Sequence, residues 1–226
     1  MQAKDKHLVK RVPPDFSIEK ARKIQLKMSK RIMTEDRFSS DIKLVAGVDV
    51  SYGGDSALAS VVVLDYDTLE VVEVRCDHVK AKFPYVSTLL LFREAPAIFK
   101  VLPKLESKPD VYLIDAHGLA HPYRCGLASY VGVVKKIPTI GVAKNTLCGR
   151  VGEYVNDIAP IVENGETIGV EMVTKRGEKP VYVSVGNMIS LNNAIGVVRY
   201  CTRSHRIPEP LRVAHEKATK ERSHIR

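Results

Sequence analysis

The chain has 226 residues, of which 45% are hydrophobic and 27% charged, as in a single globular domain with a substantial core. Its 35 lysine and arginine residues against 26 aspartate and glutamate residues give a net charge of +9, which favours a polyanion such as nucleic acid as partner. A membrane protein is not expected, because no apolar stretch approaches the roughly 20 residues of a membrane helix. A secreted, disulfide-rich protein is not expected either, because no signal peptide follows Met1 and the four cysteines form no C-x-x-C pair.

These features predict a soluble, cytoplasmic protein that consists of one domain over residues 1–226. Residues 1–14 are polar and basic and end in two prolines, so we expect a loose arm there. Residues 217–226 are predicted to form a basic tail.

The first predicted helix begins after Ser17, a residue type that caps helices. Four apolar residues recur at helical spacing and are expected to form its buried face: Ile18, Ala21, Ile24 and Met28. Basic residues crowd the opposite face, which suits either a solvated surface or one that follows a nucleic-acid backbone.

Three strands are predicted next, over residues 43–51, 58–66 and about 72–77. The short connections between them, Gly53-Gly54-Asp55 and residues 65–68, make these strands an antiparallel meander. The middle strand is a continuous apolar run, as in a strand that is buried on both faces.

Helices and strands then alternate. We expect a helix within residues 88–104, a strand over 111–115, a helix around Leu127 to Val134 and a strand over 138–143. A hairpin over 169–174 and 181–185 and a helix capped by Ser190 follow. This order predicts an α/β domain of the ribonuclease H-like fold, with a mixed central sheet, made of the antiparallel meander and parallel strands, that is flanked by helices.

Two aspartates interrupt apolar strands. Asp49 stands within Leu44–Val50, and Asp115 ends the strand that begins at Val111. A buried carboxylate is costly unless it is paired or bound to a cation, although a strand-ending aspartate is also a common turn former. On neighbouring strands, roughly 5 Å apart, the two carboxylates would share one divalent cation. Lys144 ends a third strand and would add a fixed positive charge.

If the helix predicted in residues 88–104 continues through Pro96, Glu94 lies within its apolar stripe. If a helix instead starts at Pro96, Glu94 lies just before its N-terminus. A surface ion pair with Arg93 or Lys100 is the alternative. The segment from Asp115 to Arg124 is the densest in polar groups, because it also holds two histidines and a glycine.

Five motifs resemble those of the endonuclease V family and follow in the same order: Val48-Asp49-Val50, Pro84-Tyr85-Val86, Phe92-Arg93-Glu94, Asp115-Ala-His-Gly-Leu-Ala-His-Pro-Tyr-Arg124 and Gly141-Val-Ala-Lys144. The resemblance extends from about Ser17 to His215. No single motif suffices, but the set is specific.

This resemblance implies a monomeric endonuclease that uses Mg²⁺, or Mn²⁺ in its place, and cuts nucleic acid at the second phosphodiester bond 3′ to hypoxanthine, the base formed when adenine is deaminated. Asp49 and Asp115 would bind the metal ion, and Glu94 would complete the site partly through water. Lys144 would contact the phosphate, while His121 and His215 match further active-site positions.

The same resemblance makes Pro84, Tyr85 and Val86 a wedge that separates the strands beside the lesion. Residues expected around the extruded base are Leu90, Gly118, Gly126 and Leu147, for which packing or turn roles are the alternative. The chain departs from the family pattern at Ser87, Ala116 and Thr88, which stand where proline, glycine and glycine are common. None of these is an expected metal ligand, so the departures affect base preference more than activity.

Three other functions remain open from the sequence. Another nuclease on the same scaffold, such as a ribonuclease H, would share the acids but not the wedge. An inosine-binding protein without catalysis would have lost an acid, whereas Asp49, Glu94 and Asp115 are all present. A ribonuclease that cleaves inosine-containing RNA shares every motif, since no residue marks a contact to the 2′-hydroxyl.

Overall fold

A mixed sheet forms the centre of the computed structural model, which describes residues 12–39 and 41–222. Within this part of the chain the strand order is β3-β2-β1-β4-β5-β9-β8-β7-β6. The strands are β1 (Leu44–Gly53), β2 (Ser56–Asp65), β3 (Val71–Lys80), β4 (Val111–Ile114), β5 (Thr139–Ala143), β6 (Arg150–Val151), β7 (Ile158–Glu163), β8 (Glu166–Met172) and β9 (Val181–Asn187). β4 is parallel to β1 and to β5, and the other pairs are antiparallel. The expected mixed α/β fold is confirmed.

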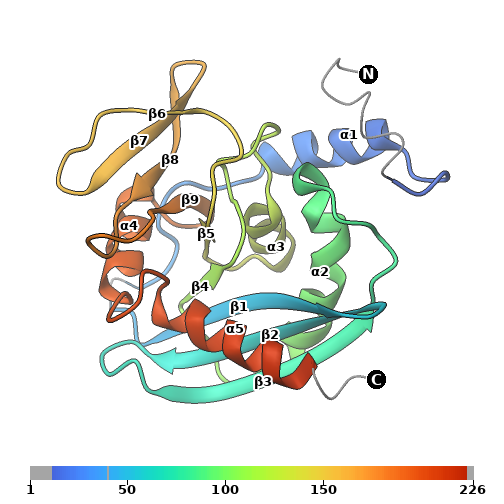
Figure 1. The fold of residues 1–226 in the computed structure, drawn as a ribbon, viewed down its shortest axis with the longest axis horizontal. Coiled ribbons are helices and arrows are strands. Elements are labelled where there is room, and N and C mark those ends of the chain that lie inside the picture. The colour runs from blue at the N-terminus through green and yellow to red at the C-terminus, as the bar shows by residue number, and fades with distance from the viewer. Residues whose placement is uncertain (1–11, 40, 223–226) are drawn as a thin grey trace.

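Helices cover both faces of the sheet (Figure 1). The helices are α1 (Ile18–Ser29), α2 (Leu90–Val101), α3 (Leu127–Lys135), α4 (Leu191–Tyr200) and α5 (Glu209–Arg222), with short 3-10 turns η2 (Ser87–Leu89) and η3 (Leu102–Lys104). One apolar core joins the sheet to α2 and α3, and a second joins it to α4 and α5. No helix among the described residues is both long enough and apolar enough to cross a bilayer.

The sequence predicted most of these elements. Ser17 and Ser190 cap α1 and α4, since their hydroxyl oxygens accept from the backbone N–H groups of Lys20 and Asn193. α2 runs through Pro96, which leaves Glu94 on a buried face of the helix.

The predicted buried face of α1 was partly wrong. Ile24 is 38% exposed, whereas the polar side chains of Arg22 and Gln25 are buried beside Ile18 and Ala21. Both polar side chains find hydrogen-bond partners on Thr88, which a single-helix pattern does not reveal.

The chain end also differs from the prediction. Residues 217–222, expected in a basic tail, continue α5, and Ala218 is fully buried against β1. Residues 223–226 and residues 1–11 of the predicted arm lie outside the described part of the chain.

Candidate metal centre and adjoining pocket

Strand register brings Asp49 and Asp115 side by side. Val48 of β1 pairs with Ile114 of β4, and the Asp115 N–H donates to the Val48 carbonyl oxygen at 3.1 Å. Asp49 follows Val48 within β1, and Asp115 follows Ile114 at the end of β4, so the two residues lie side by side where β4 ends beside the middle of β1. The side chain of Asp49 is 9% exposed and that of Asp115 15%.

Helix α5 adds His215 to this pair. Its Nδ1 lies 2.7 Å from Asp49 Oδ2, and one ligand atom each from Asp49, Asp115 and His215 lie within 4.8 Å of one another. These three residues are called the acid–histidine cluster below. Two carboxylates and an imidazole at this separation form a donor set that fits a divalent cation.

Contacts on either side of Asp49 fix α5 against β1. At Gly47, an added Cβ would lie 1.9 Å from the Pro210 carbonyl oxygen, so only glycine lets the start of α5 approach this closely. The Ser51 hydroxyl donates to the buried Ala218 carbonyl oxygen at 2.7 Å. Gly47, Asp49 and Ser51 are alternate residues of one strand, so all three face α5.

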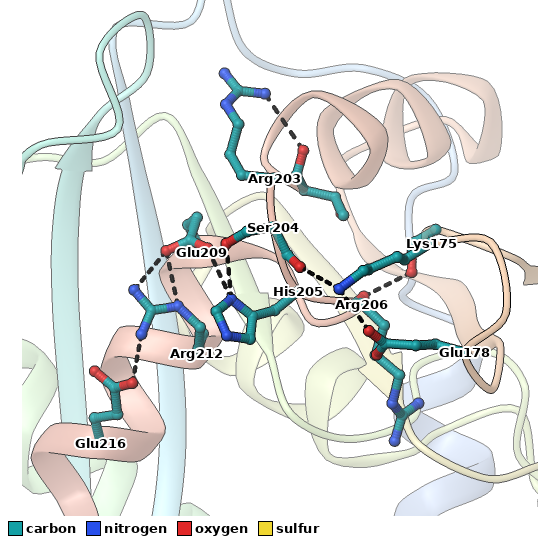
Figure 2. A network of polar contacts seen from close by, with 11 residues as sticks. Lys175, Glu178, Arg203, Ser204, His205, Arg206, Glu209, Arg212 and Glu216 are labelled. Atoms are coloured by element: carbon teal, nitrogen blue, oxygen red, sulfur yellow. Dashed lines mark hydrogen bonds and ion pairs between the residues drawn. The ribbon is translucent and has the colours of Figure 1, made fainter.

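A polar network supports the first turns of α5 (Figure 2). Arg212 forms an ion pair with Glu209 at 2.6 Å and another with Glu216, both on the same helix. Lys175, which follows β8, donates to the Ser204 carbonyl oxygen at 2.6 Å. The loop that leads into α5 is thereby tied to the neighbouring hairpin.

Lys144 and Glu94 lie close to the acid–histidine cluster. Lys144 follows β5, and its Nζ contacts Asp115 Oδ2 at 2.5 Å. Glu94 is buried on α2, and its Oε1 accepts a hydrogen bond from the Tyr52 hydroxyl at 2.7 Å. Glu94 is not among the three residues whose ligand atoms cluster.

Burial and mutual repulsion raise the pKa values of two of these acids, and a nearby positive charge would oppose this effect. Burial raises the pKa of Glu94 to about 8, and the negative charges of Asp49 and Asp115 add to the rise. Burial and the charge of Asp49 also raise the pKa of Asp115, against the opposing effect of Lys144. A divalent cation would offset the repulsion among the acids.

A narrow pocket with a cavity volume of about 20 Å³, partly open to solvent, adjoins these acids. Its lining comes from α1, the η2–α2 junction, the segment after Asp115 and the loop after Lys144: Gln25, Thr88, Leu90, Leu91, Ala116, His117, His121, Gly126, Leu127 and Leu147. Three of the four residues expected around the base, Leu90, Gly126 and Leu147, thus share one pocket.

Gly118 lies outside this lining. A Cβ on Gly118 would lie 2.1 Å from the Val185 carbonyl oxygen, so close packing onto β9 accounts for the glycine. The carbonyl oxygen of Gly118 accepts from the Gly126 N–H at 3.0 Å, which links it to the pocket wall.

The ring nitrogens of His121 both have partners in the protein. Nδ1 accepts from the Tyr123 N–H at 3.1 Å, so Nε2 carries the hydrogen and donates to the Thr88 carbonyl oxygen at 3.2 Å. Burial lowers the pKa of His121 to about 3 and keeps the ring neutral. In this arrangement His121 fixes the pocket wall and offers no free nitrogen to a substrate.

His117, for which the sequence predicted no role, differs from His121. Burial lowers its pKa to about 4, while a hydrogen bond to the backbone of Asn145 favours the charged form, as expected when the ring donates to a carbonyl oxygen. Nδ1 is buried without a hydrogen-bond partner among the described residues.

Thr88 connects the pocket to α1. Its carbonyl oxygen accepts from Arg22 and Gln25, each at 3.0 Å, and its hydroxyl oxygen accepts from Arg22 at 2.9 Å. These contacts give Thr88 a structural role at a position where glycine is common in the family pattern. No local sequence pattern predicts these contacts, since the partners are more than 60 residues apart.

The predicted wedge exposes a single large side chain. Tyr85 is 66% exposed, whereas Val86 is buried in a small core with Ile18 and Phe83. Val86 thus anchors the loop, and Pro84 is half-buried.

Comparison with known proteins agrees with this geometry. The family model for endonuclease V matches residues 26–216. The endonuclease V of Thermofilum pendens is 44% identical over 212 residues, which cover 93% of this chain and 91% of that protein. The solved endonuclease V from Streptomyces avermitilis has a TM-score of 0.85 and 34% identity, covering 95% of this chain and 97% of that one.

A third relative was solved with nucleic acid. The endonuclease V of Ciona intestinalis, in complex with a 23mer DNA that contains an inosine followed by a ribo-adenosine, has a TM-score of 0.82 and 30% identity and covers 92% of this chain and 98% of that one. A match along residues 26–216, with close relatives in sequence and in structure over nine-tenths of the chain, shows that this protein belongs to the endonuclease V family.

Proposed function

We propose that this nuclease is a Mg²⁺-dependent endonuclease of DNA repair that recognises hypoxanthine and hydrolyses the second phosphodiester bond 3′ to it, leaving a 3′-hydroxyl and a 5′-phosphate. The observation that carries the proposal is the acid–histidine cluster, whose ligand atoms lie within 4.8 Å of one another, beside a pocket built by the segment that follows Asp115. The complex of the Ciona relative with inosine-containing DNA supports the choice of base.

Asp49 and Asp115 would hold the ion, since Mg²⁺ and Mn²⁺ favour carboxylate oxygens and Mg²⁺ usually takes only one or two of them from the protein. His215 supplies the third donor of the cluster. When bound, the ion would polarise the scissile phosphate and lower the pKa of a coordinated water.

The remaining residues position the reacting groups. Lys144, which contacts Asp115, is available to donate to a phosphate oxygen once substrate has entered and neutralises charge there. The Glu94 carboxyl group, held by Tyr52, would order water beside the metal ligands. Leu90, Leu91 and Leu127 give the neighbouring pocket a largely apolar lining.

The exposed Tyr85 side chain and the pocket would contact different parts of the damaged DNA. Tyr85 would stack where the altered base has left the helix, an interaction worth about 1–3 kcal/mol per base. The extruded base would enter the pocket only as the surrounding side chains move apart to widen it, and a mispaired base leaves the duplex at lower cost than a paired one.

A nicking assay on an inosine-containing oligonucleotide, with Mg²⁺ and then with EDTA, tests the proposal. We expect one metal-dependent nick at the second bond 3′ to the inosine. Binding without nicking would instead support a non-catalytic reader, and equal nicking of an undamaged RNA–DNA hybrid would support a ribonuclease H activity.

Inosine-containing RNA is the second candidate substrate, because the DNA in the Ciona complex carries a ribonucleotide after the inosine. Cleavage rates on matched DNA and RNA strands distinguish the two, since only the 2′-hydroxyl differs. A preference for RNA of tenfold or more would replace DNA repair with RNA processing as the proposed role. The monomeric state and the cytoplasmic location stay predictions.

A further inference from the structure

A second cavity, called the wedge-side groove below, lies beside the loop that carries Tyr85. Its cavity volume is about 400 Å³, against about 20 Å³ for the pocket that adjoins the acids. Pockets that bind small ligands usually have volumes of about 300–1,000 Å³, so this groove has room for a planar base as it stands. Its lining comes from the segment before α1, the end of β3 with the chain that follows, and α2. It includes three phenylalanines and three cations: Phe16, Phe83, Phe92, Lys80, Lys82 and Arg93.

The three phenylalanine rings pack against one another and give the groove an ordered apolar part. The Phe16 ring centroid lies 4.6 Å from that of Phe83 and 5.2 Å from that of Phe92. The Phe16 N–H donates to the Pro13 carbonyl oxygen at 2.9 Å, which fixes the turn that brings this ring to the groove. Phe83 is buried, whereas Phe16 and Phe92 keep part of their surface exposed. Bases of any kind stack on aromatic rings, so this surface suits a nucleotide without selecting its identity.

The charge of the wedge-side groove suits a phosphate. Lys80 and Lys82 are exposed, and neither forms an ion pair among the described residues. Arg93 donates to the Phe83 carbonyl oxygen, so the two lysines are the cations available to a ligand. Asp15 is the single acid in the described lining. The groove therefore pairs an apolar, aromatic surface with a net positive charge, as sites for unpaired nucleotides do.

The groove and the pocket lie on opposite sides of the predicted wedge in the chain. Residues within 79–83, before Tyr85, line the groove, whereas residues within 88–91, after it, line the pocket. The two cavities share no lining residue in the described part of the chain. A wedge between two strands has one strand on each side, and the strand to be cut must lie on the side of the pocket and the acids. The groove is then left to the other strand.

We propose that the wedge-side groove binds the unpaired nucleotide of the complementary strand that stood opposite the lesion, with its base against the phenylalanines and its phosphate on Lys80 and Lys82. Extruding hypoxanthine leaves this nucleotide without a partner, and a site that receives it lowers the cost of opening the duplex. The inference rests on the proposed function and adds the undamaged strand to the substrate.

The first test places an abasic site opposite the inosine. Loss of pairing makes the lesion easier to extrude, so a protein that reads only the damaged strand should bind this duplex more tightly. We expect the opposite: wild-type protein should bind it about fivefold or more weakly than the duplex with thymine opposite, because the groove loses its base. Phe16→Leu keeps an apolar side chain and removes the ring, so this difference should shrink to within about twofold.

The second test removes the two free charges. The Lys80→Gln, Lys82→Gln double variant should bind inosine-containing duplex about 5- to 10-fold more weakly, and the slope of log Kd against log salt should fall by about two. Its affinity for the inosine-containing single strand should stay within about twofold, since that substrate has no complementary strand. Lys80→Arg with Lys82→Arg keeps both charges and should bind like wild type.

The Lys108→Gln, Lys179→Gln double variant is the matched control, because both lysines are exposed and lie outside the lining of both cavities. It loses the same charge and should leave duplex affinity unchanged. All dissociation constants are measured in EDTA, so the comparison needs neither metal nor cleavage.

Three results would overturn the inference: tighter binding of the abasic duplex by wild-type protein, unchanged duplex affinity in the Lys80 and Lys82 glutamine variant, or an equal loss of that variant on single strands. The last would assign the groove to the damaged strand. If wild-type protein does not distinguish inosine-containing from undamaged duplex, the proposed function fails instead, so the two failures are distinguishable.

Discussion

His215 Nδ1 lies 2.7 Å from Asp49 Oδ2, although the two residues are 166 positions apart in the chain. The contact exists because α5 crosses β1 between two fixed points, the close approach of Pro210 to Gly47 and the hydrogen bond from Ser51 to Ala218. The third member of the acid–histidine cluster is therefore positioned by residues that bind neither metal nor substrate.

Gly47→Ala tests this dependence. The added methyl group would collide with the Pro210 backbone, so α5 must shift, and we expect a loss of about 1–3 kcal/mol in the free energy of unfolding together with weaker Mn²⁺ binding. Gly196→Ala, in α4, is the control, because an added Cβ there has no atom within 4 Å. It should leave metal affinity unchanged and stabilise the protein by about 0.5–1 kcal/mol. Calorimetric titration with Mn²⁺ and thermal unfolding give both quantities, and undiminished Mn²⁺ affinity in Gly47→Ala would contradict the positioning role of α5.

Asp49→Ala and Asp115→Ala should each abolish cleavage while leaving DNA binding within a few-fold, because backbone phosphate contacts elsewhere persist. Gel-shift assays beside single-turnover nicking separate the two effects. Near-normal turnover in Asp115→Ala would remove this residue from the metal site.

Glu94→Gln should stabilise the metal-free protein. The folded-state pKa of Glu94, about 8, lies above its ordinary value of 4.5, so the folded state binds the extra proton between these pH values. The free energy of unfolding in EDTA therefore falls as the pH rises from about 4.5 to 8 and stays low above that. Removing the ionisable group removes this loss, which is on the order of a few kcal/mol at pH 9. Urea unfolding at pH 5 and pH 9 should show the gain of Glu94→Gln at the higher pH alone; an equal gain at both would exclude the titration of Glu94 as the cause.

Tyr85→Ala should weaken binding of inosine-containing duplex by about tenfold, since the exposed ring is expected to stack beside the lesion. Thermal stability should hardly change, because Val86 and not Tyr85 anchors this loop in the core. Equal losses on undamaged duplex would show that Tyr85 serves general DNA binding and is not a wedge.

Arg124 links the pocket segment to the tip of the β7–β8 hairpin. It forms ion pairs with Glu163 and Glu166 and also donates to the His121 carbonyl oxygen at 3.3 Å. Arg124→Ala should lower kcat/KM on inosine substrate about fivefold, and the Glu163→Gln, Glu166→Gln double variant should do the same. Steady-state kinetics on inosine substrate test whether the two variants lose the same activity. If Arg124 instead bound phosphate directly, removing the two glutamates would free it, and DNA binding measured by gel shift would become stronger.

The sequence was most informative where local pattern and tertiary structure agree. Asp49 and Asp115 could be predicted to lie together because each interrupts an apolar strand and the two strands were expected to be neighbours, and the pairing of Val48 with Ile114 places them side by side, although β1 continues to Gly53. Ser17 and Ser190 cap their helices for reasons that lie within a few residues of chain.

The rest depended on partners distant in sequence. α5 went unpredicted because polar residues dominate it and its few inward residues, such as Leu211 and Ala214, give a weak pattern. Gln25 is buried because carbonyl oxygens of two remote loops receive its amide hydrogens. The contrast between His117 and His121 follows from backbone atoms around each ring, which no motif encodes.

The placement of α5 also has a consequence for synthesis of the protein. Asp49 leaves the ribosome long before His215, and the cluster needs both. A chain that has emerged only as far as α4 holds the acids and the pocket lining but lacks the third donor. The three donors can therefore come together only after α5 has been synthesised and has docked on β1, so a nascent chain that ends before α5 would lack the complete acid–histidine cluster.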